Sequence, residues 1–248
     1  MSVRRPSDSF LAYHQWRILY QLLDALNVNV QLIDPVQGLP DMVFTANAGF
    51  AWQKKLIVSN FRHEVRRPEA IHFESWFASR NYEICHLPEK ISFEGEGDLM
   101  ICGKLLFAGY PFRSSLLSHH RAAEILEREV LSLKLIDQWF YHLDTCFCPL
   151  GENAAIYYPS AFDSAALKLL ENHINTLVPV TEEEARRFAC NAIVLDKNVI
   201  MNDGCPKIRA RLELMGFSVS QTSLTEFIKA GGSAKCLVLK VPHGANQN

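Results

Sequence analysis

A unit of two strands, a helix and a third strand recurs along this chain and limits what the chain can fold into. The hydrophobic periodicity predicts five main helices whose starts are spaced roughly 45–60 residues apart, over residues 7–27, 68–81, 119–130, 161–174 and 206–215. Short apolar runs typical of strands lie between them, often in pairs, as at 99–101 and 105–107. Single runs follow several helices, at 28–33, 82–87, 133–136 and 217–219.

Five such units predict an α/β fold of ββαβ repeats packed around a common axis, because an isolated hairpin buries too little surface to be stable. A doubly wound parallel sheet is the rival fold. Hairpins recur too often for it, however, and no Gly-x-Gly-x-x-Gly motif follows a strand. No linker rich in proline, glycine or serine divides the chain. We therefore expect a single domain over residues 1–248, with a frayed tail at 242–248.

Composition and charge exclude several classes of protein. Hydrophobic residues make up 48% of the 248 residues, as in soluble globular chains, and the formal charge of −2 gives no attraction for nucleic acid. No run reaches the roughly 18 apolar residues of a membrane span, and the basic start of the chain leads into residues too polar for a secretory signal. Seven scattered cysteines suit a reducing compartment. We expect a cytoplasmic protein without nucleic-acid or membrane partners; the sequence leaves its oligomeric state open, a homo-oligomer included.

Most polar side chains set among apolar neighbours fall in four short stretches, at residues 39–49, 93–98, 141–146 and 231–236. Each stretch lies at the end of a predicted strand or in the loop beside it. Catalytic groups commonly sit in such places, where a rigid scaffold positions a loop. The four stretches are therefore the candidates for a functional site.

Cys236 and His142 are the candidate nucleophile and its acid–base partner. A thiol attacks as the thiolate, which a nearby imidazolium favours. Cys236 follows a Gly-Gly-Ser loop and precedes a predicted strand over 237–241, so its sulfur would be presented at the entrance of a strand. A lone cysteine is more often a packing residue, and a lone histidine is more often structural. Their spacing in the sequence does not show whether the two meet in the fold.

Two carboxylates, Glu94 and Asp144, point to a cationic substrate. Both lie in apolar, strand-like surroundings beside turn residues, with no obvious Lys or Arg neighbour in the sequence. A buried carboxylate needs a partner, and the planar guanidinium group, with its fork of N–H donors, matches carboxylates bidentately. The alternative is that residues 94–98 form an ordinary acidic turn.

A metal site is the competing interpretation of the third stretch. His142, Cys146 and Cys148 are residue types that bind zinc. No second pair of Cys or His residues stands at zinc-finger spacing, and alternate residues of a strand do not close a tetrahedron. We therefore expect neither a metal nor an organic cofactor. The adjacent Arg66 and Arg67 are expected to be exposed to solvent.

Taken in order, these stretches resemble the guanidino-modifying enzymes of the pentein superfamily, which include arginine deiminases, dimethylarginine dimethylaminohydrolases and amidinotransferases. The resemblance runs from about residue 39 to 241 and rests on three motifs: Glu-Gly-x-Gly-Asp at 94–98, His-x-Asp at 142–144 and Gly-Gly-x-x-x-Cys at 231–236. Each motif is short, but their occurrence together in this order is specific. The resemblance implies a five-bladed α/β propeller and a hydrolase acting on the C–N bonds of a linear amidine.

The resemblance also implies a role for each matching residue. Cys236 would be the nucleophile and His142 the general acid and base, while Glu94 and Asp144 would hold the guanidinium. The substrate would be arginine or a derivative of it, and its α-amino and α-carboxylate groups would be contacted by Asp41, Arg62 and Arg113.

Asn47 stands where deiminases and dimethylarginine hydrolases usually have an acidic residue. The stretches around Asn47, His142 and Cys236 more closely resemble the ornithine-forming arginine dihydrolases, which convert arginine to ornithine, carbon dioxide and two ammonia. An amide offers both a donor and an acceptor. Asn47 could therefore tolerate a neutral ureido group, which a carboxylate would bind poorly and release.

Three other functions stay open at this point. The first is a citrulline-forming deiminase or dimethylarginine hydrolase, which Asn47 argues against. The second is an amidinotransferase, which needs access for an acceptor amine. The third is an arginine-binding propeller without activity, which the joint presence of Cys236, His142, Glu94 and Asp144 argues against.

Overall fold

The computed structural model describes residues 7–241, which form a mixed α/β fold containing four three-stranded sheets. In sheet order, the strands are β1 (Gly49–Trp52), β2 (Lys55–Val58) and β3 (Glu83–Cys85); β4 (Leu99–Cys102), β5 (Leu105–Tyr110) and β6 (Val130–Lys134); β7 (Phe147–Pro149), β8 (Ala154–Tyr157) and β9 (Thr176–Pro179); and β10 (Ile193–Leu195), β11 (Asn198–Asn202) and β12 (Ser218–Thr222).

Every sheet has the same topology. Its first two strands form an antiparallel hairpin, and the third pairs in parallel with the second. In the fourth sheet, for example, Val194 lies opposite Val199, and Val199 pairs with Val219. Since a tight turn cannot join parallel strands, the chain crosses through a helix between the second and third strands. The predicted ββαβ unit is thus confirmed four times.

Side-chain caps begin three of the helices. Asp8 accepts a hydrogen bond from the amide of Leu11, and Asp163 and Thr181 act in the same way at α4 and α5. The five predicted main helices are confirmed, with ends shifted by a few residues. The α-helices are α1 (Ser9–Ala25), α2 (Ala70–Ala78), α3 (Leu116–Leu126), α4 (Ser164–His173), α5 (Glu182–Ala185), α6 (Pro206–Leu214) and α7 (Thr225–Lys229).

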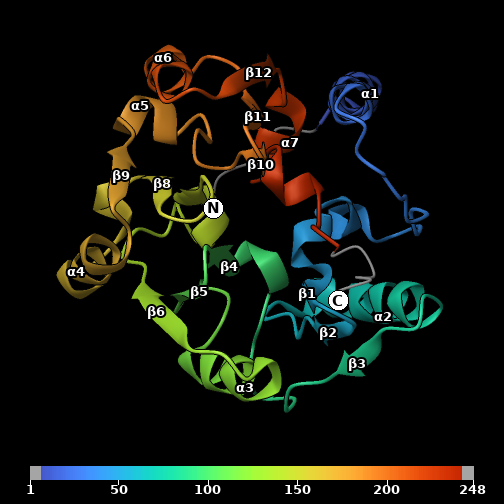
Figure 1. Cartoon of the computed structure of the whole chain (residues 1–248). Helices are drawn as coiled ribbons and strands as arrows, with labels where there is room; N and C mark the ends of the chain where they lie inside the picture. The colour runs from blue at the N-terminus through green and yellow to red at the C-terminus, as the bar shows by residue number, and fades with distance from the viewer. Residues whose placement is uncertain (1–6, 242–248) are drawn as a thin grey trace.

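The sheets are ranged around the centre of the molecule, with α2, α3, α4 and α6 toward the outside (Figure 1). Short 3-10 helices lead into the first strands of three sheets. Of these, η2 contacts η4 and η7, and η4 contacts η5. The four polar stretches of the sequence are therefore brought together here. The 3-10 helices are η1 (Pro40–Val43), η2 (Thr45–Ala48), η3 (Glu64–Glu69), η4 (Gly95–Gly97), η5 (Leu143–Thr145), η6 (Pro159–Ala161) and η7 (Lys235–Leu237).

The fifth unit is not a sheet within residues 7–241. The predicted strands at 28–33 and 237–241 are wrong: the first segment has no regular structure, and the second has none after η7 ends at Leu237. A strand requires a partner ladder, which an apolar run does not supply by itself. The rival doubly wound sheet is also excluded, because the strands lie in four separate sheets. A five-bladed count stays a prediction, and the predicted frayed tail at 242–248 lies outside the described residues.

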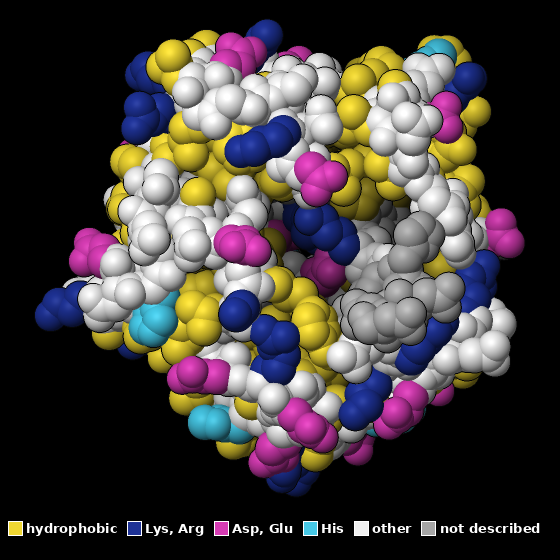
Figure 2. Space-filling model, viewed as in Figure 1, with side chains coloured by type: hydrophobic (Ala, Val, Ile, Leu, Met, Phe, Trp, Pro, Cys, Tyr) yellow, Lys and Arg dark blue, Asp and Glu magenta, His cyan; other side chains and the backbone are white. Residues whose placement is uncertain are grey.

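The hydrophobic core packs neighbouring sheets against each other, and charged side chains lie in a hollow near the centre of one face. Phe107 of β5 and Phe147 of β7 are fully buried, with ring centroids 5.6 Å apart. Figure 2 shows a hollow near the centre of one face, in which side chains of both charges lie.

All seven cysteines are free thiols. Within residues 7–241, no helix is long and apolar enough to cross a membrane.

Candidate active site

Glu94 and His142 meet at the centre of the fold. Each lies immediately before a 3-10 helix, η4 and η5 respectively, and both side chains are buried. His142 Nε2 lies 2.8 Å from Glu94 Oε2. Since an ionised carboxylate only accepts hydrogen bonds, Nε2 carries the hydrogen, which leaves Nδ1 as the nitrogen available for proton transfer.

Glu94 is surrounded by donors. Arg113 Nη1 lies 3.2 Å from Oε2, and the backbone amide of Arg62 donates to Oε1 at 3.2 Å. Burial raises the pKa of Glu94, but the hydrogen bond from His142 and the charges of His142 and Arg113 outweigh it and lower the pKa to about 2. Glu94 has no Lys or Arg neighbour in the sequence, but Arg113 reaches it from 19 residues away. Glu94 is thus placed to orient His142.

Cys236 and Asp144 form the second half of the site. The thiol Sγ donates to Asp144 Oδ2 at 3.2 Å, and both residues are buried. Asp144 Oδ1 is also buried and has no hydrogen-bond partner in the part of the chain that the structure describes. Burial and the neighbouring carboxylate raise the pKa of Cys236 well above its ordinary value, and burial raises that of Asp144. Both influences favour the protonated thiol, in agreement with its hydrogen bond to Asp144 Oδ2.

Asn191 is a site residue that the sequence analysis missed. Its Nδ2 donates to Cys236 Sγ at 3.0 Å and to the backbone oxygen of Asp144 at 3.1 Å. A signal was present, because Asn191-Ala192 stands directly before β10, as Asn47-Ala48 stands directly before β1.

Asn47 is buried, and its amide is held by an arginine. Arg66 Nη1 donates to Asn47 Oδ1 at 2.9 Å, and the guanidinium of Arg66 binds Glu69 through Nε at 2.9 Å and Nη2 at 2.8 Å. Arg66 was expected to be exposed but is buried, since Glu69 one helical turn later satisfies its charge. Because Arg66 occupies Oδ1, Asn47 presents its N–H groups to the rest of the site, and one reaches the backbone oxygen of Glu94 at 3.4 Å.

At two motif positions, neighbouring atoms lie so close to the backbone that only glycine fits. A Cβ on Gly97 would lie 2.3 Å from Asn47 Nδ2 and 3.4 Å from the His142 ring. A Cβ on Gly232 would lie 2.4 Å from the Phe44 ring and 3.1 Å from Cys236 Cβ. The motif glycines thus allow the polar side chains to converge.

Further buried charged residues form contacts between the 3-10 helices η4, η5 and η7. Asp98 accepts from Ser114 Oγ at 2.7 Å and from the amide of Leu143 at 3.1 Å, and burial raises its pKa to about 6. Lys235, next to the nucleophile, forms a buried ion pair of 2.7 Å with Glu96. These contacts join η4 to η5 and to η7.

The residues expected to contact the α-amino and α-carboxylate groups of the substrate line one pocket. A cavity of about 560 Å³ is bounded by Asp41, Arg62, His63, Glu64, Val65 and Arg113. It adjoins the buried site, because Arg62 and Arg113 both bind Glu94. Arg113 also stacks on Tyr141, 4.4 Å from the ring centre. The structure therefore places Asp41, Arg62 and Arg113 around one pocket, and their contact with a substrate stays a prediction.

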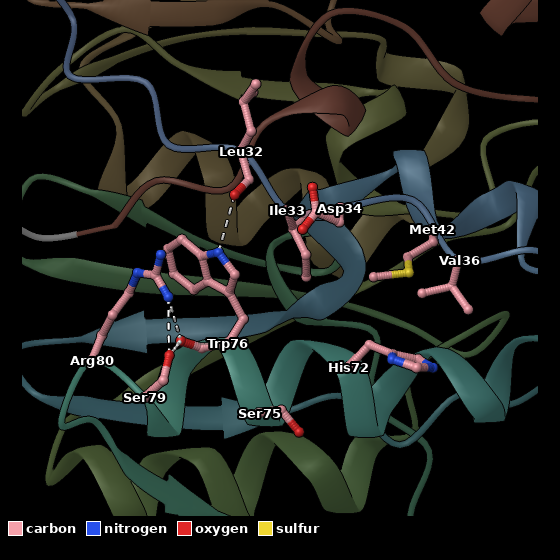
Figure 3. A pocket seen from close by; sticks show the side chains of 10 residues that line it. All are labelled: Leu32, Ile33, Asp34, Val36, Met42, His72, Ser75, Trp76, Ser79 and Arg80. Atoms are coloured by element: carbon pink, nitrogen blue, oxygen red, sulfur yellow. Dashed lines mark hydrogen bonds between the residues drawn. The ribbon is translucent and has the colours of Figure 1, made fainter.

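A second pocket lies apart from this site. It has a volume of about 440 Å³ and is formed between residues 32–36 and α2. Figure 3 shows its lining, where Trp76 donates to the backbone oxygen of Leu32 and Arg80 bonds to Ser79. None of the candidate catalytic or binding residues lines it.

The residues of the zinc interpretation are not arranged as ligands. The thiol of Cys146 faces the backbone oxygens of His142 and Leu143, and that of Cys148 faces the backbone oxygen of Ala192. Among residues 7–241, no three His, Cys, Asp or Glu side chains are grouped to hold a metal ion.

The depressed pKa of Glu94 predicts an acid-sensitive fold. Its carboxylate stabilises the folded state fully above its ordinary pKa of 4.5, and this contribution is lost as pH falls toward about 2. We expect wild type to lose about 3 kcal/mol more free energy of unfolding over that range than Glu94→Gln. Urea unfolding at pH 6 and at acidic pH measures this. Equal losses in the two proteins would contradict the assigned ion pair.

Comparisons with known proteins find relatives over nearly the whole of the described chain. A family model described as N,N dimethylarginine dimethylhydrolase, eukaryotic, matches residues 7–242. The bifunctional arginine dihydrolase/ornithine cyclodeaminase AgrE of Nostoc sp. is 45% identical over 234 residues, which are 93% of this chain and 33% of that protein. The N(G),N(G)-dimethylarginine dimethylaminohydrolase of Mycobacterium tuberculosis is 36% identical, covering 97% of this chain and 79% of that protein. The chain thus spans about a third of AgrE.

Solved structures share the mixed α/β fold. The N-terminal domain of the cyanobacterial arginine dihydrolase ArgZ, a Cys-to-Ser mutant bound to substrate, matches with a TM-score of 0.93 and 43% identity, covering 95% of this chain and 88% of that one. The same domain bound to product matches equally well. A dimethylarginine dimethylaminohydrolase adduct, 23% identical with a TM-score of 0.81, covers 94% of this chain and 92% of that one.

Proposed function

Because the chain belongs to the N,N dimethylarginine dimethylhydrolase family, we propose that it is a cysteine-dependent hydrolase of the guanidinium group of L-arginine. The proposed products are ornithine, carbon dioxide and two ammonia. The relatives AgrE and ArgZ, which are arginine dihydrolases by name, favour this substrate and outcome.

One observation carries the proposal. The buried Asp144 Oδ1 has no hydrogen-bond partner among the described residues, and it belongs to the carboxylate that touches the Cys236 thiol. A buried anion of this kind requires a cationic ligand. A guanidinium bound there would have its central carbon beside the sulfur.

The first half of the reaction follows from the charges. The guanidinium neutralises Asp144, which removes one cause of the raised pKa of Cys236. The thiol proton passes to His142, and the thiolate attacks the guanidinium carbon. His142, oriented by Glu94, then protonates one amino group, which leaves as ammonia. A covalent thiouronium cation remains on Cys236.

The second half regenerates the enzyme. His142 takes a proton from water, the hydroxide adds to the thiouronium carbon, and collapse expels the thiolate and leaves a ureido group. In a second cycle, Cys236 attacks the ureido carbon and the remaining terminal nitrogen leaves as ammonia. Water hydrolyses the resulting S-thiocarbamate and releases the Cys236 thiol, and the carbamate breaks down to ornithine and carbon dioxide.

Asn47 supports the second cycle. Because Arg66 occupies its oxygen, the amide has only N–H donors to offer the ligand. A donor suits the carbonyl oxygen of a ureido group, so the intermediate is retained. A carboxylate at this position would repel that oxygen.

We assign the α-carboxylate to Arg62 and Arg113 and the α-amino group to Asp41, which share the 560 Å³ cavity. The Arg62 side chain donates to the backbone oxygen of Pro111 at 2.9 Å, and only its backbone amide binds Glu94. Arg62→Met should therefore raise KM for arginine by about 10- to 100-fold with little change in kcat. The same variant should show no such loss with agmatine, which lacks the carboxylate. An equal loss with both substrates would refute this assignment.

Product analysis tests the proposed function. Purified protein is incubated with arginine, and ornithine, citrulline and ammonia are resolved. Ornithine with two ammonia per arginine supports the dihydrolase. Citrulline with one ammonia identifies a deiminase, and amidine transfer to an added amine identifies an amidinotransferase. Arginine binding without any product indicates an arginine-binding propeller that has no enzymatic activity.

We also propose that residues 1–248 form one catalytic domain built as a five-bladed propeller. Its fifth blade would combine residues 28–33 with residues 238–241, because Val28, Val30 and Val238 pack against the same hydrophobic cluster. A cytoplasmic location is supported by the seven free thiols.

A further inference from the structure

We infer that Asn191 is a further catalytic residue, whose amide holds the Cys236 sulfur and stabilises it as the thiolate. The inference rests on the proposed function and adds to it a residue that the motifs do not contain. It is supported by hydrogen bonds at both the oxygen and the nitrogen of the buried Asn191 amide.

The orientation of the Asn191 amide is fixed by its partners. Oδ1 accepts from the backbone amide of Cys236 at 3.2 Å. A backbone N–H can only donate, so the atom that faces it must be the oxygen. The nitrogen Nδ2 therefore points at Cys236 Sγ, 3.0 Å away, and also donates to the backbone oxygen of Asp144 at 3.1 Å.

Asn191 also anchors the turn that carries the nucleophile. Its backbone oxygen accepts from the amide of Lys235 at 3.2 Å. Three groups of residues 235–236 are therefore bound to this one residue: two backbone amides and the sulfur. Asn191 itself is fully buried, two residues before β10, so water does not compete for these bonds.

The donor at sulfur opposes the two influences that keep the thiol protonated. Burial and Asp144 raise the pKa of Cys236, whereas the hydrogen bond from Asn191 lowers it. Once a guanidinium neutralises Asp144, the N–H···S contact becomes a charge-assisted hydrogen bond to the thiolate. The thiolate forms before each attack and again when each covalent intermediate collapses, so the donor acts in every cycle.

Asn191→Asp keeps the anchor and changes only the group that faces the sulfur. Aspartate keeps an oxygen for the amide of Cys236 but replaces the N–H at the sulfur with a second negative charge. The matched control is Asn202→Asp, since Asn202 is also a buried asparagine whose amide holds backbone groups, those of Arg187, Asp203 and Leu224. Asn191→Ser, which adds no charge, is made alongside it. Slower alkylation in both variants supports the role of the N–H donor, whereas slower alkylation in Asn191→Asp alone is an effect of the added charge and overturns the inference.

Two measurements are made on each folded variant. The first is the rate of Cys236 modification by iodoacetamide between pH 7 and pH 10 without substrate, followed by peptide mass spectrometry. We expect it to fall about 10-fold at each pH in Asn191→Asp, as for a thiol pKa raised by about one unit. The second is turnover of arginine, where we expect kcat to fall roughly 100-fold with KM changed far less. Asn202→Asp should match wild type in both.

A folded Asn191 variant with a wild-type alkylation profile overturns the inference, whatever its turnover. The alkylation assay does not require arginine to be the substrate. If wild type fails to hydrolyse arginine but alkylation still slows in the variant, the proposed function fails and the role of Asn191 at the sulfur stands.

Discussion

Cys236→Ser is expected to lower the release of ammonia from arginine by at least about 10⁴-fold while arginine still binds. The hydroxyl is a far weaker nucleophile than a thiolate at this site, so no covalent intermediate forms. The contacts proposed for the substrate do not involve the sulfur, because they come from Asp144 and from the cavity around Arg62 and Arg113.

Calorimetric titration with arginine and an ammonia assay on the same preparation measure both halves of this result. Cys85→Ser is the control, since Cys85 is a half-buried free thiol in β3 outside the site. It should keep full activity. A Cys236→Ser enzyme that still turns over would show that the sulfur is not the nucleophile.

Asn47→Asp is expected to change the main product from ornithine to citrulline, shifting the ratio by at least about tenfold. Aspartate is close in shape to asparagine and keeps an oxygen for Arg66 Nη1, now 2.9 Å from Asn47 Oδ1. What is lost is the N–H donor toward the ligand. A carboxylate binds the guanidinium well but repels the ureido oxygen, so citrulline leaves before the second attack.

The ratio is measured by resolving both amino acids after a single incubation with arginine, with Asn202→Asp as the control. Consumption of arginine by Asn47→Asp should continue, since the first cycle does not need the amide donor. An unchanged product ratio in an active Asn47→Asp enzyme would remove Asn47 from the explanation of the second cycle.

The sequence predicted the repeating unit because helix and strand periods are local properties. The helix at 206–215, for example, is observed at Pro206–Leu214, where Pro206 suits a first helical turn. The strands at 28–33 and 237–241 were wrong for the opposite reason. Their apolar runs fit a strand, but strand formation depends on a partner that the run itself does not encode.

The candidate residues could also be named from sequence, because they are polar side chains set among apolar neighbours in short motifs. The pairing of Glu94 with His142 spans 48 residues, and that of Asp144 with Cys236 spans 92. No local pattern specifies contacts over such separations. The sequence therefore named Cys236 and His142 without showing that they belong to one site.

The amino-acid sequence by itself determined the ββαβ unit, the motif residues and the chemistry those residues can perform, since these depend on residue type and short-range spacing. Only the tertiary structure decided which groups neutralise one another. It placed Arg113 on Glu94, Arg66 on Asn47 and Asn191 on the Cys236 sulfur. It also left one oxygen of Asp144 without a partner among the described residues. Burial makes each of these pairings necessary, because a charged or polar group removed from water is destabilising unless another group of the folded protein pairs with it.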